Sequence, residues 1–453
     1  MTLRRANPAR PSWWIRQSTS GGLALVVAAA VAPAACVPVA PHPGFQQSEA
    51  SERRLLAAAS AGQLVVGWNT SEPGLLAARC HVIRSHPSLG VSLVAPRPGE
   101  SREGLAAALR ADPAVSFVEP NQILARPKPG RPAGGGAFER ERARPVLGFD
   151  ATDDPLLERQ WHLERIGAVA AWKVGAGAGV VAAVVDTGVD PDHPDLRANL
   201  LPGANTFDGD DPRDTDGHGT HVAGLIAAAA GNGEGGAGVA PGARILPIRA
   251  IGSWGGTAES VAAGITYAVD HGARIVNLSL GNRRSAKVVE RAVKYAADRH
   301  VILVASMGND GDKGNPINYP AALQGVVAVG ASDRTDIAPA WSSSGAWQDL
   351  AAPGVGIWST FPTYECRMLQ DFRKDPEECP GCELDLGYAS IDGTSQAAPQ
   401  ASAALALLLA RHPAMTPADA IARLERTARD LGEPGRDPHY GAGLLDLPAA
   451  LAN

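Results

Sequence analysis

The sequence lacks the features of membrane-spanning and nucleic-acid-binding chains. Its apolar stretch near the start, 21–35 of 453 residues, is shorter than the roughly 20 residues that a helix needs to cross a bilayer. Its 41 basic residues are outnumbered by 47 acidic ones, and they form no stripe interleaved with aromatic side chains. We therefore expect no transmembrane span and no nucleic-acid partner.

Cysteine is scarce, and its count is odd. The five are Cys36, Cys80, Cys366, Cys379 and Cys382. The last three fall in an acidic stretch, 363–386, which we expect to be a surface loop. In an oxidising compartment one disulfide within this stretch is expected, with the third thiol free or paired elsewhere. A metal site is disfavoured because no fourth ligand accompanies the three thiols.

Residues 1–36 have the pattern of a secretory signal peptide. Arginines precede the apolar stretch, and small residues follow it. The chain is therefore expected to be secreted or extracytoplasmic. The run Ala34-Ala35-Cys36 also permits a lipid anchor on Cys36, although Pro33 stands where such sites usually carry an aliphatic residue. A membrane-anchored lipoprotein remains the alternative.

Two further segments precede the largest part of the chain. Residues 37–126 contain apolar runs at 63–68, 91–94 and 115–118 and a helical pattern at 102–110, which together predict a small α+β module. Residues 127–150 are rich in proline and glycine. Such a composition predicts an extended, exposed linker that is open to proteolysis.

From 151 to 453 apolar strands alternate with helices. Runs that are apolar on every position predict strands buried on both faces, and the helices between them predict an α/β fold with a doubly wound, mainly parallel sheet. Active sites in such sheets lie at the carboxyl ends of the strands. The predicted strands are 180–185, 244–248, 275–278, 301–305 and 326–329, and the predicted helices include 257–271 and 285–300.

Three polar residues stand where such a fold builds chemistry. Asp186 ends a predicted strand, His218 begins a buried helix within DGHGTHVAG, and Ser395 precedes an apolar helix within GTSQAAP. Alone, each has a structural interpretation: a turn residue, a packed histidine and a helix cap. Together they fit nucleophilic catalysis, because a serine hydroxyl needs an imidazole to take its proton and a carboxylate to orient that imidazole.

The motifs DTGV, GHGTHVAG and GTSQAAP resemble the subtilisin-like serine peptidases, in that family's order of aspartate, histidine and serine. HPDL, GVAP, VNLSLG and NYPAA extend the resemblance over about residues 151–446. It implies a serine endopeptidase that hydrolyses peptide bonds in protein or peptide substrates through an acyl-enzyme. It also implies that Asn309, otherwise a turn residue in MGNDG, stabilises the oxyanion together with the backbone N–H of Ser395.

The resemblance implies a primary specificity pocket too. Met307, Gln396 and Gln400 depart from the family's usual alanine, methionine and histidine at their positions, which puts the shape of the pocket in doubt. Asp310 and Asn318 align with its rim and base, so a basic or polar substrate residue is an alternative to an apolar one. The implied pocket residues are Ser279, Leu280, Gly281, Ala305 and Ser306.

Calcium is the cofactor that the resemblance implies, and no organic cofactor is expected. Hard cations bind several oxygens, and the chain offers acidic and amide side chains in two places. The alternative is a solvated acidic loop. The candidate ligands are Asp195 with Asn232, and Asp208 with Asp210 in a loop that also contains Asp211 and Asp214.

The upstream module resembles the inhibitory propeptide of such enzymes through DPAVSFVEPN at 112–121. This resemblance implies a zymogen whose own propeptide is an intramolecular inhibitor, with self-processing that leaves a mature chain starting between about Pro127 and Asp153. A nucleotide-binding loop at 175–180 is disfavoured, because its glycines precede the strand that ends at Asp186 rather than follow it. A non-catalytic homologue that only holds a peptide is the remaining alternative.

Overall fold

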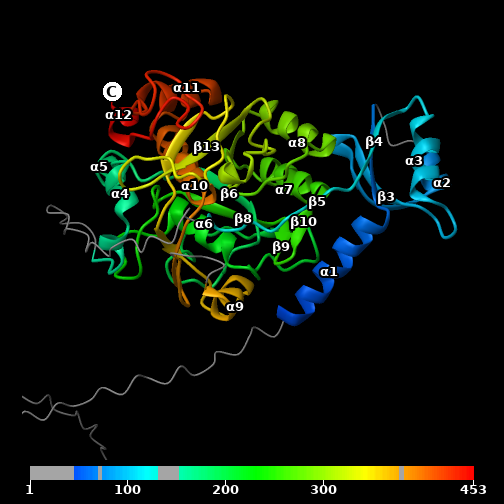
Figure 1. Ribbon diagram of the computed structural model, residues 1–453, viewed down its shortest axis with the longest axis horizontal. Coiled ribbons are helices and arrows are strands. Elements are labelled where there is room, and N and C mark those ends of the chain that lie inside the picture. Colours follow the sequence, from blue (N-terminus) through cyan, green and yellow to red (C-terminus); the bar gives the residue numbers. More distant parts are fainter. Residues whose placement is uncertain (1–44, 70–73, 131–152, 377–381, 453) are drawn as a thin grey trace, which may run out of the picture. The chain divides into compact units, whose positions relative to one another are not determined.

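The computed structural model describes residues 45–69, 74–130, 153–376 and 382–452 (Figure 1). The predicted signal peptide, Cys36, Cys379 and most of the predicted linker lie outside these residues. Among the described residues, none of the helices combines the length and the apolar character needed to cross a bilayer.

A seven-stranded sheet forms the centre of the larger part of the chain, in the order β14-β13-β12-β11-β6-β8-β7. Every pair of neighbours is parallel. This arrangement confirms the predicted α/β fold. The strands are β6 (Val181–Asp186), β7 (Ala204–Asn205), β8 (Arg244–Arg249), β11 (Ile275–Leu278), β12 (Ile302–Ser306), β13 (Val326–Ser332) and β14 (Leu350–Pro353).

Helices cover both faces of this sheet, which explains why its strands are apolar on every position. In β6, Ala182 and Val184 pack in one core cluster with α6 (His218–Ala227) and α10 (Thr394–Arg411). The alternate residues Ala183 and Val185 pack in a second cluster with α7 (Ala258–Asp270) and α8 (Lys287–Ala297). The period of two along a strand thus divides β6 between two cores.

Shorter elements complete the larger part. The β9–β10 hairpin pairs antiparallel, as do β15 and β16 with β17. These elements are η2 (Leu157–Arg159), α4 (Trp161–Arg165), α5 (Ala168–Trp172), β9 (Ile251–Gly252), β10 (Gly255–Thr257), η3 (Gly311–Lys313), β15 (Ile357–Thr360), α9 (Arg367–Lys374), β16 (Glu383–Leu384), β17 (Tyr388–Ile391), α11 (Pro417–Thr427) and α12 (Leu447–Leu451).

The upstream residues form a separate antiparallel sheet in the order β2-β3-β1-β4. On one face, Leu64 and Val66 pack with Leu105 and Leu109 in a core of their own. On the other face, Val65 joins the core cluster that contains α7 and α8, so the module packs on the larger part. The elements are α1 (Phe45–Ala61), β1 (Leu64–Trp68), α2 (Gly74–Arg79), β2 (His81–His86), η1 (Pro87–Leu89), β3 (Val91–Ala95), α3 (Arg102–Arg110), β4 (Val115–Pro120) and β5 (Ile123–Leu124).

The acidic stretch 363–386 was expected to be a surface loop. That expectation was partly wrong, because the stretch contains helix α9. Met368 and Leu369 of α9 are buried against Phe361 and Cys366 in a small apolar cluster. The Cys366 thiol is free and buried, whereas Cys382 is disulfide-bonded. The stretch is therefore a packed subdomain with its own core.

Candidate active site

The strand β6 and the helix α6 bring Asp186 and His218 together. Asp186 is the last residue of β6 and His218 the first of α6, and both side chains are buried. The Oδ1 atom of Asp186 lies 2.8 Å from Nδ1 of His218 and also accepts a 2.7 Å hydrogen bond from the backbone N–H of Thr187. The carboxylate can therefore hold the imidazole in the tautomer that leaves Nε2 unprotonated.

Asp214 fixes the loop that leads into α6. Its buried carboxylate accepts hydrogen bonds from the backbone N–H groups of Asp216, Gly217 and Thr220 and from the hydroxyls of Thr187 and Thr220. Because both oxygens are used by these donors, Asp214 supports the loop that carries His218. The sequence placed Asp214 only among the acidic side chains of a candidate calcium loop and indicated no such role.

Three carboxylates determine the charge state of His218. Burial lowers the pKa of the imidazole, but Asp186, Asp216 and Asp214 outweigh burial and raise it above its ordinary value. Asp216 is itself fully buried, and burial raises the pKa of its carboxyl to about 6, against the opposing charge of Arg126. A proton-accepting imidazole therefore predominates only above the raised pKa of His218.

Ser395 lies in the first turn of α10 and is nearly buried. Its hydroxyl donates to the carbonyl of Ser279 (3.2 Å) rather than to His218, and the Ser279 hydroxyl donates to the carbonyl of Ser395 (2.9 Å). Serine hydroxyls rotate readily, and catalytic hydrogen bonds often align only in the reacting complex.

Asn309 follows β12, and its side-chain amide is held in one orientation. The Oδ1 atom accepts hydrogen bonds from the N–H (3.0 Å) and the hydroxyl (2.9 Å) of Thr394. The Nδ2 atom is therefore directed outward, and it donates to the carbonyl oxygen of Lys128 at 2.9 Å. Thr394, next to Ser395, therefore fixes the Asn309 amide, a contact that the motif GTSQAAP could not reveal because Asn309 lies 85 residues earlier in the chain.

Residues 123–130 run through this site. Ile123 and Leu124 of β5 pair antiparallel with β10. The carbonyl of Lys128 accepts a hydrogen bond from Asn309, and the N–H of Gly130 donates to the carbonyl of Asp392 at 2.8 Å. An extended peptide binds in this way when it adds a strand to the edge of a sheet and one of its carbonyl groups accepts a hydrogen bond from an amide donor. Residues 127–130 were expected to belong to an exposed linker, but they make these contacts with the larger part of the chain. A composition rich in proline does not reveal such distant partners.

The predicted pocket residues come from two strand ends that meet at Asn318. Gly281 approaches Asn318 so closely that a Cβ atom on Gly281 would lie 2.3 Å from its side-chain amide. Asn318 in turn donates to the carbonyl of Ser306 at 3.2 Å. Ser279, Leu280 and Gly281 follow β11, and Ala305 and Ser306 end β12.

Two residues noted near this pocket are engaged elsewhere. Met307 is fully buried in the core cluster with α7 and α8. Asp310 pairs with Arg283 at 3.0 Å and with Lys313 at 3.5 Å, so its charge is already compensated. Asp310 therefore offers no uncompensated carboxylate to a basic residue of a substrate.

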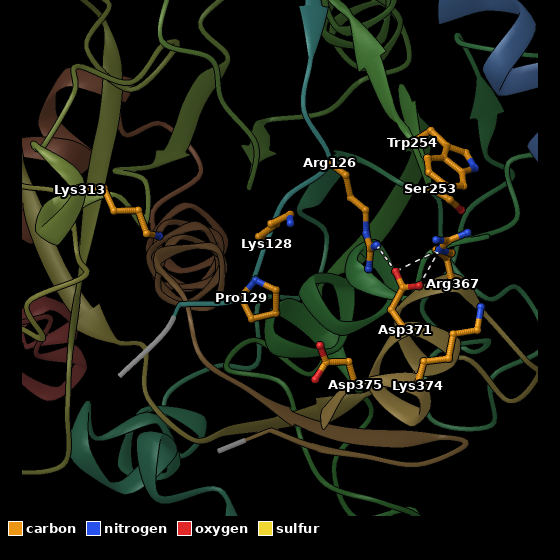
Figure 2. A pocket seen from close by; sticks show the side chains of 10 residues that line it. All are labelled: Arg126, Lys128, Pro129, Ser253, Trp254, Lys313, Arg367, Asp371, Lys374 and Asp375. Atoms are coloured by element: carbon orange, nitrogen blue, oxygen red, sulfur yellow. Dashed lines mark hydrogen bonds and ion pairs between the residues drawn. The ribbon is translucent and has the colours of Figure 1, made fainter. Parts of the chain in front are cut away.

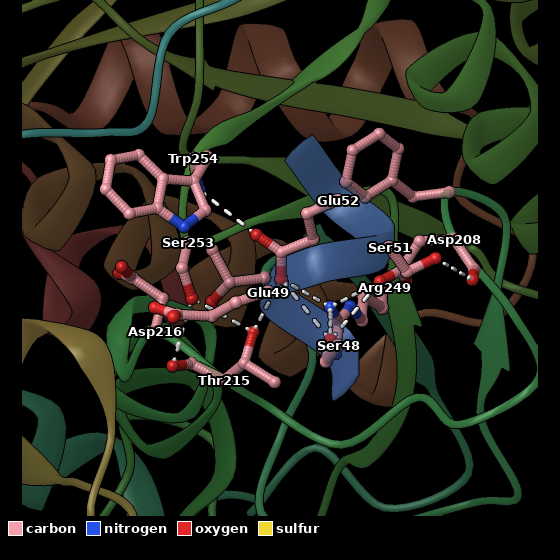
Figure 3. A network of polar contacts seen from close by, with 12 residues as sticks. Ser48, Glu49, Ser51, Glu52, Asp208, Thr215, Asp216, Arg249, Ser253 and Trp254 are labelled. Atoms are coloured by element: carbon pink, nitrogen blue, oxygen red, sulfur yellow. Dashed lines mark hydrogen bonds and ion pairs between the residues drawn. The ribbon is translucent and has the colours of Figure 1, made fainter. Parts of the chain in front are cut away.

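The calcium candidates differ in their surroundings. Asp195 is fully buried and accepts hydrogen bonds from Asn232 Nδ2 (2.8 Å) and Gly236 N (3.2 Å), and burial raises its pKa to about 7. Asp208 instead pairs with Arg249 at 2.9 Å (Figure 3). In the part of the chain that the structure describes, no group of three or more histidine, cysteine or acidic side chains is arranged for a metal.

Comparisons with known proteins show the family of the chain. The subtilase family profile, Peptidase_S8, matches residues 177–443. Thermitase of Thermoactinomyces vulgaris is 36% identical over 305 residues, which is 67% of this chain and 99% of thermitase. The minor extracellular protease Epr of Bacillus subtilis (strain 168) is 37% identical over 66% of this chain, but the match spans only 43% of Epr.

Among solved structures, the crystal structure of fervidolysin from Fervidobacterium pennivorans aligns with a TM-score of 0.71 and 31% identity. The alignment covers 86% of this chain and 60% of the fervidolysin chain, which is described as a keratinolytic enzyme related to subtilisin. The chain thus belongs to the subtilase family and is a subtilisin-like serine endopeptidase.

Proposed function

We propose that the chain is a secreted endopeptidase, made as an inhibited precursor, with Ser395 as nucleophile, His218 as general base and Asp186 as its orienting group. One observation carries the proposal: the carbonyl of Lys128 accepts a hydrogen bond from Asn309, whose own amide oxygen is held by Thr394 next to Ser395. A substrate carbonyl in the same position would be polarised by a fixed donor.

The proposed roles imply the following reaction. His218 takes the proton of the Ser395 hydroxyl while the hydroxyl oxygen attacks the carbonyl carbon of the substrate. The developing oxyanion accepts hydrogen bonds from Asn309 Nδ2 and from the backbone N–H of Ser395. Collapse releases the amine, which receives the proton from His218, and leaves an acyl-enzyme on Ser395. Water deprotonated by His218 then hydrolyses the ester. Asp186 stabilises the imidazolium throughout.

The upstream module is the proposed intramolecular inhibitor. Glu119 accepts hydrogen bonds from the N–H groups of Lys287 (3.0 Å) and Val288 (3.1 Å), at the positive N-terminal end of α8. Together with β5 on β10 and residues 126–130 in the site, this contact supports a propeptide that holds the enzyme closed to substrates until it is cleaved.

The test compares the wild-type chain with Ser395→Ala, each produced in a host that lacks similar peptidases. Wild type should appear as a form that starts between about Pro127 and Asp153 and should react with a fluorophosphonate probe. Ser395→Ala should remain a full-length, unlabelled precursor without peptidase activity, because only the nucleophile is removed. Mass spectrometry decides: equal processing of both chains would mean that another enzyme makes the cut.

Calcium and localisation complete the proposal. Asp195 fits a cation, because it is buried and within the described residues its side chain accepts only from uncharged donors. Asp195 and Asn232 would hold the ion, whose charge would compensate the carboxylate. Arg249 already compensates the charge of Asp208, and Asp210 remains a candidate on sequence grounds alone.

The proposal of secretion rests on residues 1–36. A lipid anchor at Cys36 is the alternative, which mass spectrometry of the exported protein would reveal.

A further inference from the structure

A cavity of about 640 Å³ lies beside the proposed active site, and the side chain of Arg126 enters it (Figure 2). Helix α9, from the stretch 363–386, contributes a large part of the lining. Other lining residues include Ser253 and Trp254 of the β9–β10 turn, and Lys313.

Two carboxylates from separate parts of the chain hold the Arg126 guanidinium. Its Nε atom lies 2.5 Å from Oδ2 of Asp216, two residues before His218, and its Nη1 atom lies 2.7 Å from Oδ2 of Asp371 on α9. Asp216 is fully buried, and neither of its carboxylate oxygens has a hydrogen-bond partner within the described residues, so its charge depends on the ion pair with Arg126 and on His218 when the imidazole is protonated. A buried carboxylate without a countercharge is strongly disfavoured.

Arg126 belongs to the segment that occupies the site as a substrate would. It stands two residues before Lys128, whose carbonyl meets Asn309. Once this segment has left, Asp216 and Asp371 face the cleft and can receive the corresponding residue of another peptide. We propose that Asp216 and Asp371 form a subsite that selects arginine two residues before the residue whose carbonyl reacts. The inference rests on the endopeptidase function proposed above.

The contacts favour arginine over other basic residues. The Arg126 guanidinium meets the two carboxylates through two different nitrogens, with a hydrogen bond from Nη1 to Asp371 and an ion contact between Nε and Asp216. A lysine ammonium is instead a single point charge on a flexible stem. Asp371 is also held in place, because Arg367 Nε lies 2.9 Å from its Oδ1 atom and the Arg367 guanidinium lies over Trp254 at 4.2 Å. The cavity is not acidic as a whole, since Lys313, Arg367 and Lys374 also line it. Selection therefore depends on this pair and not on net charge.

The test uses three quenched fluorescent peptides with the sequence of residues 123–130, in which Pro129→Ala supplies an ordinary peptide N–H after the reacting carbonyl. The residue at the position of Arg126 is arginine, lysine or citrulline, a neutral isostere of arginine. For cleavage after the lysine that corresponds to Lys128, kcat/KM of the mature enzyme should be about 10- to 100-fold higher for arginine than for citrulline, the range expected of hydrogen bonds to a charged group. Lysine should fall between.

The variant Asp371→Asn should lower kcat/KM for the arginine peptide about tenfold, mainly by raising KM. It should change kcat/KM for the citrulline peptide less than twofold. Asp298→Asn, which removes an exposed charge at the end of α8, is the matched control and should leave kcat/KM unchanged for both peptides. Equal kcat/KM for arginine and citrulline, or cleavage at another bond, would overturn the subsite while the endopeptidase stands. An enzyme that cleaves no peptide and does not label at Ser395 would overturn the proposed function, and the subsite with it.

Discussion

The charge of Asp216 acts on His218 as well as on a bound arginine. It is one of the carboxylates that raise the pKa of the imidazole. Because His218 is a base only when neutral, activity should fall as the pH drops through that pKa. Asp216→Asn removes one of the raising charges, so the pKa of His218 should fall and the acidic limb of kcat/KM should move to lower pH.

This pH profile is best measured with the citrulline peptide, which has no charge at the position of Arg126. Asp371→Asn is the matched control, since Asp371 is not among the charges that act on His218, and its acidic limb should coincide with that of wild type. An unshifted limb in Asp216→Asn would mean that Asp216 does not influence the proposed base.

Among single residues, Asp186, His218 and Ser395 could be proposed from the sequence because each is embedded in a characteristic run of neighbours. Thr394, Asp214, Asp216 and Asp371 could not be found in the same way. Their roles depend on hydrogen bonds and ion pairs between loops far apart in the sequence. Only the folded chain brings such partners together.

Among the elements, two loops meet at the proposed calcium site: the loop between β6 and β7 carries Asp195, and the loop between α6 and β8 carries Asn232. If an ion binds at Asp195 and Asn232, a chelator should lower the melting temperature of the mature enzyme, because a ligand that binds only the native state stabilises it. Asp195→Asn should lower the melting temperature without chelator and abolish most of the chelator effect. Differential scanning calorimetry measures both.

The exposed Asp210 provides the matched control for this experiment. Asp210→Asn should respond to the chelator as wild type does. A melting curve that the chelator leaves unchanged in wild type would exclude calcium at Asp195, and a lost response in Asp210→Asn would place the ion in the other loop.

The predictability of an element depended on where its apolar residues point. The central strands are buried on both faces and stand out as continuous apolar runs, so five of them were predicted within a few residues. In contrast, β2 is half exposed, and α9 has four charged residues among its eight and only two buried ones, so neither forms a long apolar run. Short elements of this kind owe their stability to tertiary packing.

At the scale of the whole molecule, the module and the larger part meet at a buried cluster of charges around Arg249 (Figure 3). Glu52 of α1 is fully buried there, with Oε1 2.7 Å from Arg249 Nη2. The hydroxyl of Thr215 donates to the same carboxylate at 3.2 Å, as does the N–H of Trp254. Burial raises the pKa of Glu52 from 4.5 to about 7, although Arg249 opposes the shift.

The sign of this shift makes the proposed inhibition weaken as the pH rises. A carboxyl whose pKa is raised in the docked state binds more protons there than in an undocked helix. Its contribution is therefore fully present below pH 4.5 and is lost as the pH rises through about 7, with a ceiling of roughly 3 kcal/mol for a shift of this size. Docking of α1 should loosen between pH 5 and 8.

Hydrogen exchange in the Ser395→Ala precursor measures this docking without interference from cleavage. After correction for the intrinsic pH dependence of exchange, the protection of α1 amides should fall from pH 5 to pH 8. Glu52→Gln, a neutral side chain of the same shape, should make the protection nearly independent of pH. Glu49→Gln on the same helix, which alters the contact with Arg367 instead, should keep the wild-type trend. Constant protection of α1 in the Ser395→Ala precursor would show that the ionisation of Glu52 does not control docking, and the proposed inhibitor would then be insensitive to pH at this contact.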